Sequence, residues 1–201
     1  MIKMKRSLSI LSVAAAAITG QAQNAPGTAG DTATIHAETR VVLVDAVAVG
    51  LQSSSILASG RISGETRELA LAPPVSLTQA DIRELQLAKA AIAAGLRILV
   101  RRWGAGIQDL QTVYLAGAFG NYLNIDSARR IGLIEAGLSL VEPAGNTSLR
   151  GVKMALLRPS LSSEWIAGAR GCVEHVPLAA DPLFEETFID CLAFGSAPFS
   201  G

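Results

Sequence analysis

Apolar residues recur at three- and four-residue intervals along the stretch that follows Thr78. The recurring positions are Ile82, Leu85, Ala88, Ile92, Leu96 and Leu99, and this spacing places them on one face of a helix. Thr78 can cap that helix through its hydroxyl, and Asp81 provides an acidic first-turn residue. The pattern therefore predicts an amphipathic helix that ends near Arg101 and Arg102, with Asp81, Glu84 and Lys89 lying off the buried stripe.

The rest of the chain alternates between short apolar runs and helical patterns. The apolar run at residues 112–116 predicts a strand, which breaks in the turn Gly117-Ala118-Phe119-Gly120-Asn121. A second strand is expected at residues 138–142 and should end at Pro143. The remaining expected elements are helices at residues 126–131, 148–157, 162–170 and 182–193, and a strand at residues 172–177. This alternation of expected strands and helices is typical of an α/β fold, so we predict a mixed sheet with flanking helices.

The N-terminal half is less regular. Residues 41–51 form a continuous apolar run, and periodicity does not decide between a buried strand and a buried helix there. Residues 53–67 are polar and contain glycine, which indicates a loop, and Pro73-Pro74 closes that section. Residues 1–34 are interpreted as a signal-like or disordered leader with its linker. Residues 35–201 are expected to form one α/β lobe.

The leader has the layout of a secretory signal. Basic residues precede an apolar run at residues 8–18, and Gly20-Gln21-Ala22 offers small residues to a signal peptidase. Its apolar core is too short to span a bilayer. Cleavage after Ala22 would make the protein periplasmic or secreted. If the alanine-rich start is instead incidental, it carries no information about where the protein is located.

Composition narrows the classes of function. Half of the 201 residues are hydrophobic, 17% are charged, and the formal net charge is zero. Without a basic stripe, a nucleic-acid partner is not expected. The only cysteines are Cys172 and Cys191 and the only histidines His36 and His175, a set too sparse and too widely spaced for a zinc or iron–sulfur site. We expect both thiols to be buried.

Two strand-to-helix turns are the candidate ligand-binding features. Glycine allows the main chain to approach a ligand closely, and a helix N-terminus presents free N–H groups at the carboxyl edge of a sheet. The first candidate turn comprises Gly117, Ala118, Phe119, Gly120 and Asn121; the second comprises Gly145, Asn146 and Thr147. The alternative interpretation is that these glycines only permit tight turns and close helix packing.

Three segments in a fixed order carry a family resemblance. They are LTQADIRELQLAKAAI at residues 77–92, VYLAGAFGNY at 113–122, and GNT at 145–147 with KMALL at 153–157. Together they resemble the C-terminal part of the reductive activators of corrinoid proteins, which are ATP-dependent members of the acetate and sugar kinase, heat-shock cognate and actin (ASKHA) superfamily. The resemblance implies one lobe of the actin-like ATPase fold, with the first turn near the adenosine side and the second facing the cleft. It also implies ATP with Mg²⁺ as ligand, a corrinoid protein as partner and a cytoplasmic location.

This sequence lacks several motifs of the family, and the missing motifs change the function that we expect. The four cysteines of a [2Fe–2S] domain and the Asp-x-Gly-Thr phosphate loops are missing from this sequence. We therefore expect a partial, truncated lobe that has no iron–sulfur cluster, binds nucleotide weakly and does not catalyse by itself. Such a lobe should associate with itself or dock to the missing lobe.

Other functions are less well supported. The leader leaves open a secreted, non-enzymatic α/β binding module. Glu185, Glu186 and Asp190 lack a partner histidine and are interpreted as a solvated helix face. A methyltransferase that uses S-adenosylmethionine would need a glycine loop after the first strand, and Glu142 alone gives it little support. No catalytic residue is assigned.

Overall fold

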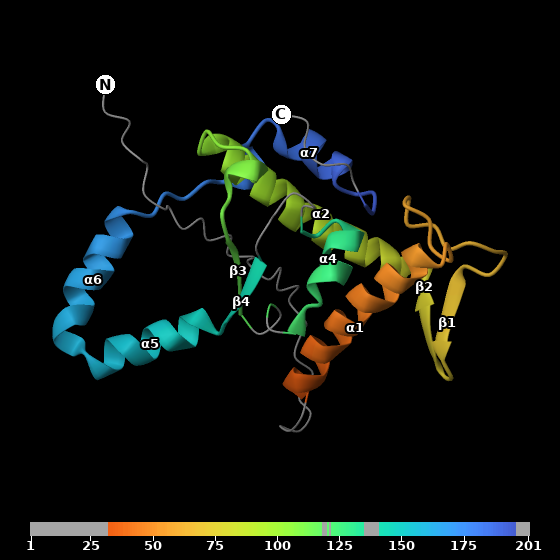
Figure 1. Cartoon of the computed structure of the whole chain (residues 1–201), viewed down its shortest axis with the longest axis horizontal. Helices are drawn as coiled ribbons and strands as arrows, with labels where there is room; N and C mark the ends of the chain where they lie inside the picture. The colour runs from red at the N-terminus through yellow and green to blue at the C-terminus, as the bar shows by residue number, and fades with distance from the viewer. Residues whose placement is uncertain (1–31, 118–119, 121, 135–140, 196–201) are drawn as a thin grey trace.

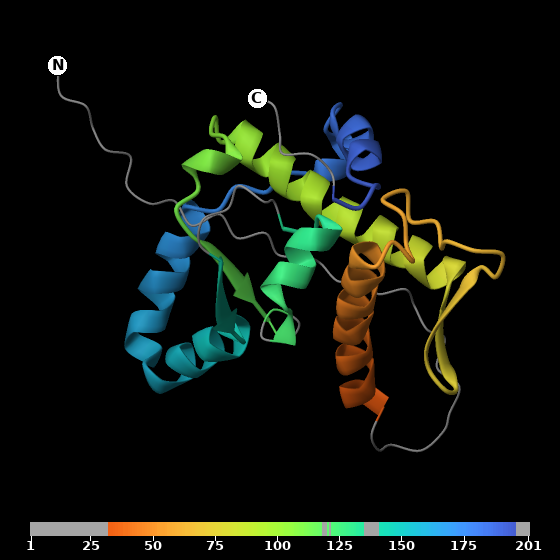
Figure 2. The same cartoon turned by 45° about the vertical axis from the view of Figure 1, so that its right-hand side comes forward.

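The computed structural model describes residues 32–117, 120, 122–134 and 141–195, with residues 32–41 and 159–162 described by their main chain alone. Three helices pack around the main core: α1 (Thr32–Gln52), α2 (Gln79–Arg102) and α4 (Ile125–Ile131). In both Figure 1 and Figure 2, α4 lies beside α1 beneath the long helix α2. The predicted leader lies outside the described residues, but Thr32–Thr34, assigned to the linker, belong to α1.

The apolar run at residues 41–51 is helical. Val44, Val47 and Ala48 are buried at helical spacing against the core, while Val42 and Val49 are exposed. The surrounding sequence extends α1 to 21 residues, a length typical of helices and too long for a strand. The length of α1 and its packing against α4 therefore show that residues 41–51 are part of a helix and not a strand.

The N-terminus of α2 is confirmed in detail. The Thr78 hydroxyl oxygen accepts a hydrogen bond from the Asp81 amide at 3.3 Å, and the Thr78 amide donates to Asp81 Oδ2 at 2.8 Å. This reciprocal pair is a capping box, which satisfies two donors that a helix start leaves without acceptors. The Thr78 hydroxyl also donates to the same carboxylate at 2.7 Å.

We expect the capping box to make stability depend on pH. Hydrogen bonds from the side chain and then the backbone of Thr78 hold the pKa of Asp81 below its usual value. A lowered folded-state pKa stabilises the protein above the unfolded value of about 3.9, and this gain is lost as the pH falls through the folded value. Asp81→Asn should therefore cost about 0.5 kcal/mol at neutral pH, a small effect because solvent screens the carboxylate. Chemical denaturation at neutral pH and near pH 2 should show the difference vanish in acid.

Glu84→Gln is the matched control for this prediction, because Glu84 is an exposed carboxylate on the same helix. It should leave the pH dependence as in the parent protein. A stability gap for Asp81→Asn that persists in acid would contradict the linkage.

The buried face of α2 is wider than predicted. Ile82 is buried as expected, but Ala88 is exposed, and Lys89, assigned to the polar side, is 1% exposed. The reason is a second layer: α7 (Phe184–Asp190) packs on the side of α2 opposite α1 and α4 and covers Ala90, Ala93 and Ala94. Helical periodicity predicted the face of α2 that packs towards α1 and α4. It did not predict the second buried face, which α7 covers.

The described strands form two separate pairs. β1 (Glu68–Ala72) and β2 (Val75–Thr78) make an antiparallel hairpin around Pro73-Pro74, a feature that the sequence analysis missed. β3 (Val113–Ala116) and β4 (Val141–Gly145) pair in parallel. β3 is confirmed, whereas β4 continues past Pro143, where we expected it to end; residues 138–140 of the expected strand lie outside the described residues. Proline is tolerated because a strand paired on one side can turn the missing N–H away from its partner.

The C-terminal half contains α5 (Thr147–Leu157), α6 (Pro159–Gly171) and α7, with short 3₁₀ turns at Ile107–Asp109 and Leu178–Ala180. All three predicted helices are present, although α6 begins earlier and α7 is shorter than expected. In Figure 1, α5 and α6 form an arm that extends away from α1, α2 and α4. The predicted strand at residues 172–177 is wrong, because that segment pairs with no described strand.

Candidate functional site

The two predicted turns lie side by side at the carboxyl ends of parallel strands. β3 and β4 run in register from Val113 opposite Val141 to Ala116 opposite Gly145. The Gly117 amide then donates a hydrogen bond of 2.8 Å to the carbonyl oxygen of Gly145. The first residue of one turn therefore contacts the first residue of the other, at the edge of a parallel pair where α/β proteins hold ligands.

A left-handed glycine follows β3, and another ends β4. Gly117 has φ +97° and Gly145 has φ +72°, a conformation that side chains with a Cβ adopt only at a cost. Apart from its chain neighbours, no described residue lies within 4 Å of the position that a Cβ on Gly117 would occupy. Gly117 is therefore required for its backbone conformation, and the described residues leave space beside it.

Gly120 has a different role. It is buried, and a Cβ at this position would lie 2.9 Å from the carbonyl carbon and oxygen of Leu115 on β3. Of the two interpretations of these glycines, ligand approach or close packing, close packing of the backbone on β3 accounts for Gly120. The other predicted members of the first turn, Ala118, Phe119 and Asn121, lie outside the described residues.

The second turn leads directly into α5. Asn146 caps this helix, because its Oδ1 accepts a hydrogen bond of 3.0 Å from the Leu149 amide. Asn146 and Thr147 are both exposed. The earliest amides of any helix lack intrahelical acceptors, so the start of α5 presents donors at the same edge as Gly117. Positive charge is added nearby, since α5 carries Arg150 and Lys153 and no acidic residue.

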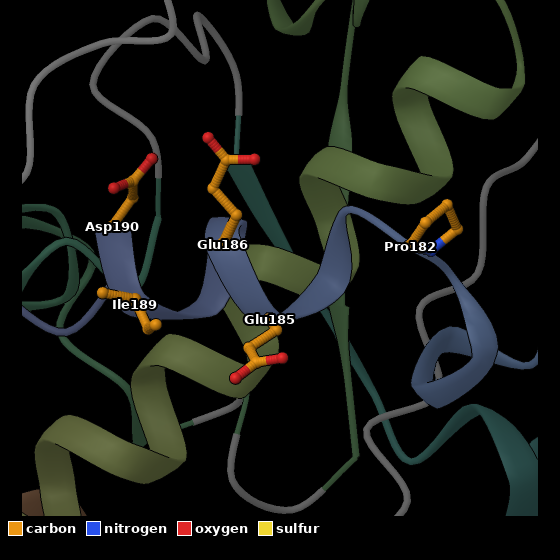
Figure 3. Close-up of a pocket in the computed structure, with 5 residues that line it drawn as sticks. All are labelled: Pro182, Glu185, Glu186, Ile189 and Asp190. Carbon is orange, nitrogen blue, oxygen red and sulfur yellow. The ribbon is translucent and has the colours of Figure 1, made fainter.

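The acidic residues of α7 form a shallow surface hollow of about 340 Å³ rather than a catalytic cluster. Figure 3 shows Glu186 and Asp190 directed to one side of α7 and Glu185 to the other. All three side chains are exposed, as expected for a solvated helix face. Among the described residues, no group of three histidine, cysteine or acidic side chains is placed to hold a metal ion.

The remaining predicted features have mixed outcomes. Cys191 is buried, but Cys172 is exposed, so the expectation of two buried thiols is wrong for Cys172. His175 is exposed, although not on a strand. Of the described helices, none combines the length and the apolar character that a bilayer crossing requires.

Exposed aromatic side chains also lie near the turns, and they were not predicted from the sequence. Tyr114, on β3, is 54% exposed, and Tyr122, just after the first turn, is 71% exposed. Large exposed aromatic rings close to a glycine turn are suited to stacking on a planar ligand. The alternation of residues along β3 could have indicated Tyr114, because Val113 and Leu115 point to the opposite face.

A parallel strand pair with two adjacent glycine turns, which shares one core with the surrounding helices, is the arrangement expected for one lobe of an actin-like α/β protein. Comparison with known families agrees: residues 41–199 match the family described as the C-terminal domain of RACo, the ASKHA domain. The chain belongs to this family. The resemblance inferred from the three segments is thereby confirmed, as is the α/β fold class.

Similar proteins are corrinoid activators. The chain is 37% identical over 122 residues to the corrinoid activation enzyme RamQ of Eubacterium limosum, covering 60% of this chain and 20% of that protein. It is 28% identical over 128 residues to the [Co(II) methylated amine-specific corrinoid protein] reductase of Methanosarcina barkeri, covering 63% and 24%. A solved reductive activator for a corrinoid, iron-sulfur protein superposes with a TM-score of 0.65 at 28% identity, covering 77% of this chain and 28% of that one. The chain thus spans about a fifth to a quarter of the length of these curated relatives.

Proposed function

We propose that this chain forms the nucleotide-facing edge of an ATP-dependent reductive activator of a corrinoid protein. The observation that carries the proposal is the 2.8 Å hydrogen bond between Gly117 and Gly145, which joins two strand-ending turns at one edge. Membership of the ASKHA family adds ATP as the natural ligand of such an edge. A corrinoid protein is the proposed partner, because the similar proteins are named for acting on corrinoid proteins.

The residues present fit part of a nucleotide. The space that the described residues leave beside Gly117 would admit a planar group, and the exposed ring of Tyr122, which follows the same turn, would stack on it. The first-turn amides of α5, with Asn146 and Thr147, would hydrogen-bond anionic or ribose oxygens. When bound, ATP would supply the free energy that drives reduction of the corrinoid. Mg²⁺ would accompany it, held by groups outside this edge.

Catalysis requires more than this edge provides. Exposed apolar side chains along α5, including Leu149, Val152 and Leu156, indicate a surface that packs against something further. We propose that the lobe, residues 35–201 extended to the start of α1 at Thr32, packs on the remainder of an ATPase domain or on another copy of itself. It would work in the cytoplasm, where ATP and corrinoid enzymes act, and would not hydrolyse ATP alone.

Photo-crosslinking with azido-ATP tests the proposed edge, because covalent capture detects binding too weak for calorimetry. We expect label in peptides that contain residues 113–122 or 141–150. Gly117→Ala should reduce that label severalfold, since alanine at φ +97° shifts the turn. Mass spectrometry of the digested protein provides the measurement.

Gly104→Ala is the matched control. Gly104 also has a positive φ, +75°, and open space where its Cβ would stand, but it lies after α2 and away from the edge. Both variants should lose about 1 kcal/mol of stability, and only Gly117→Ala should lose label. Equal loss in both, or label confined to other peptides, would contradict the proposed function.

A further inference from the structure

A second pocket, of about 640 Å³, lies between the loop that precedes β1 and the N-terminal half of α2. Arginines line it from three segments: Arg61 from the loop, Arg67 from the start of the hairpin, and Arg83 from α2. Glu65 is the only acidic lining residue, so the ionisable groups around the pocket carry a net positive charge. The three arginines are exposed, so this is a pocket open to solvent, and its volume is large enough to admit a small organic ligand.

The three guanidinium groups are not neutralised by neighbours. Within the described part of the chain, none of them forms an ion pair or a side-chain hydrogen bond, whereas Arg102 pairs with Asp181 at 2.8 Å. Each guanidinium has five donors in a planar fork that matches the oxygens of a phosphate. The three arginines are exposed, so their guanidinium groups form a donor set that solvent, and no described protein acceptor, satisfies.

The loop that carries Arg61 is held in place by α2. Gln79 uses both ends of its amide: Nε2 donates to the carbonyl oxygen of Gly60 at 2.7 Å, and Oε1 accepts from the Ile62 amide at 3.1 Å. These two bonds lie on either side of Arg61 in the sequence. The main-chain amide of Gln79 also donates to the carbonyl oxygen of Arg67 at 3.2 Å. One residue therefore fixes the backbone at two of the three arginines.

A second glutamine completes this attachment. Gln86 is 2% exposed, and its Nε2 donates to the carbonyl oxygens of Ser59 and Leu192 at 3.1 and 3.0 Å. Gln79, Arg83 and Gln86 are spaced four and three residues apart, which places them on one face of α2. Arg83 thus projects from the helix face to which the Arg61 loop is bound. Because these bonds already hold the backbone at Arg61 and Arg67, less backbone entropy is lost when the site binds a ligand.

We propose that this pocket is a binding site for a phosphorylated small molecule, with Arg61, Arg67 and Arg83 as the groups that bind its phosphates. Gln79 is a positioning residue, which holds the Arg61 loop against α2. The volume exceeds what one phosphate ion needs, so the expected class of ligand is an organic polyphosphate or an inorganic chain of phosphates. The ligand chemistry common to both is a row of phosphate oxygens, which three separate guanidinium groups can engage together.

The proposed site is distinct from the edge at Gly117 and Gly145. In both Figure 1 and Figure 2 the β1–β2 hairpin and the β3–β4 pair lie on opposite sides of α1 and α4. The inference therefore does not depend on the proposed function, and the two can fail separately.

Isothermal titration with inorganic tripolyphosphate at low ionic strength tests the site. We expect Arg61→Gln, Arg67→Gln and Arg83→Gln each to weaken binding about tenfold, the effect of losing one charge-assisted contact. Gln79→Leu keeps all three arginines and should still weaken binding severalfold, because the Arg61 loop loses its attachment. Circular dichroism and thermal unfolding show whether each variant is folded.

Arg158→Gln is the matched control, since it removes one exposed positive charge at the end of α5. It should leave the Kd unchanged, whereas a loss equal to that of the pocket variants would overturn the proposal in favour of general charge attraction. Unchanged binding by folded Arg61→Gln/Arg67→Gln/Arg83→Gln protein would also overturn it. Butanetetracarboxylate, a carboxylate close to tripolyphosphate in charge, should bind at least tenfold more weakly; equal binding would refute the phosphate class.

Two further measurements separate the sources of phosphate and the two proposals. If ATP competes with tripolyphosphate in the parent protein and not in the arginine variants, the pocket accepts nucleotide phosphates; if ATP does not compete, it selects phosphate chains without a nucleoside. Gly117→Ala should leave tripolyphosphate binding intact. Binding that depends on the arginines, together with no azido-ATP label near Gly117, would support this site while refuting the proposed function.

Discussion

Replacing Lys89 with alanine is expected to lower the free energy of unfolding by about 3 kcal/mol, in the range for truncating a long, fully buried side chain. Lys89 is 1% exposed in the middle of α2. Its Nζ donates to the carbonyl oxygen of Ala193 and lies 5.6 Å from the centre of the Phe194 ring. The variant loses the packing of the methylene chain, the charge-assisted hydrogen bond and the cation–π contact together. Urea denaturation followed by circular dichroism measures the change.

Lys153→Ala is the matched control, because Lys153 is an exposed lysine in the middle of α5. Its effect should stay within about 0.5 kcal/mol, as for most surface substitutions. Lys89→Met, which keeps most of the side-chain volume, should cost less than Lys89→Ala, since it leaves a smaller cavity in the packing between α2 and the C-terminal segment. An effect of Lys89→Ala as small as that of Lys153→Ala would show that the C-terminal segment does not cover α2 in solution.

The same segment is held by further contacts, which explains why the loss of Lys89 should be large. The Phe194 amide donates to the carbonyl oxygen of Ala58 at 2.8 Å, and the Phe194 ring is 2% exposed. Gln86 holds the neighbouring carbonyl of Leu192. Lys89 therefore joins the C-terminal segment to the long helix at the point where the Arg61 loop is also attached.

Gly120→Ala is expected to destabilise the protein by about 2 kcal/mol and to displace the first turn of the candidate site. The new Cβ would lie 2.9 Å from main-chain atoms of Leu115, and a strand backbone yields less readily than the end of a flexible side chain. Overpacking of this kind typically costs 1–3 kcal/mol. We expect azido-ATP labelling near Gly117 to fall with stability, as measured on samples that circular dichroism shows to be folded.

Gly151→Ala is the control with the opposite expected sign. Gly151 lies inside α5, and a Cβ there would meet nothing within 4 Å. Alanine is the better helix former, so this variant should gain up to about 1 kcal/mol. If both substitutions had the same sign, the close approach of Gly120 to Leu115 would not be the controlling contact.

Local patterns predicted the elements whose determinants are close together in sequence. The capping box of Thr78 and Asp81 lies within four residues, so the start of α2 was predictable and is confirmed. The cap of α5 by Asn146 is equally local. The strand expected at residues 172–177 had the right alternation but is wrong, because a strand exists only through pairing, and no described strand lies beside it.

The candidate edge was predicted in part. Both candidate turns were predicted to lie at the carboxyl edge of a sheet, and the parallel register with the hydrogen bond between Gly117 and Gly145 brings them together there. Their contact with a ligand stays a prediction. Sequence patterns did not suggest the arginine pocket, because Arg61, Arg67 and Arg83 come from three elements that the amide of Gln79 joins only after the chain has folded.

The sequence by itself determined the family, the helix α2 with its cap, and the glycines at the ends of β3 and β4, since each depends on propensity, capping or spacing within a few residues. The helical state of α1 was not among them. Only the tertiary structure decided the burial of Lys89, the attachment of the Arg61 loop to α2 and the close packing of Gly120 on Leu115. Burial is the property of a pair of surfaces, and α7 and Phe194 lie about a hundred residues along the chain from Lys89. A helical pattern reports which side of α2 can be apolar, and the packing partners decide which side is covered.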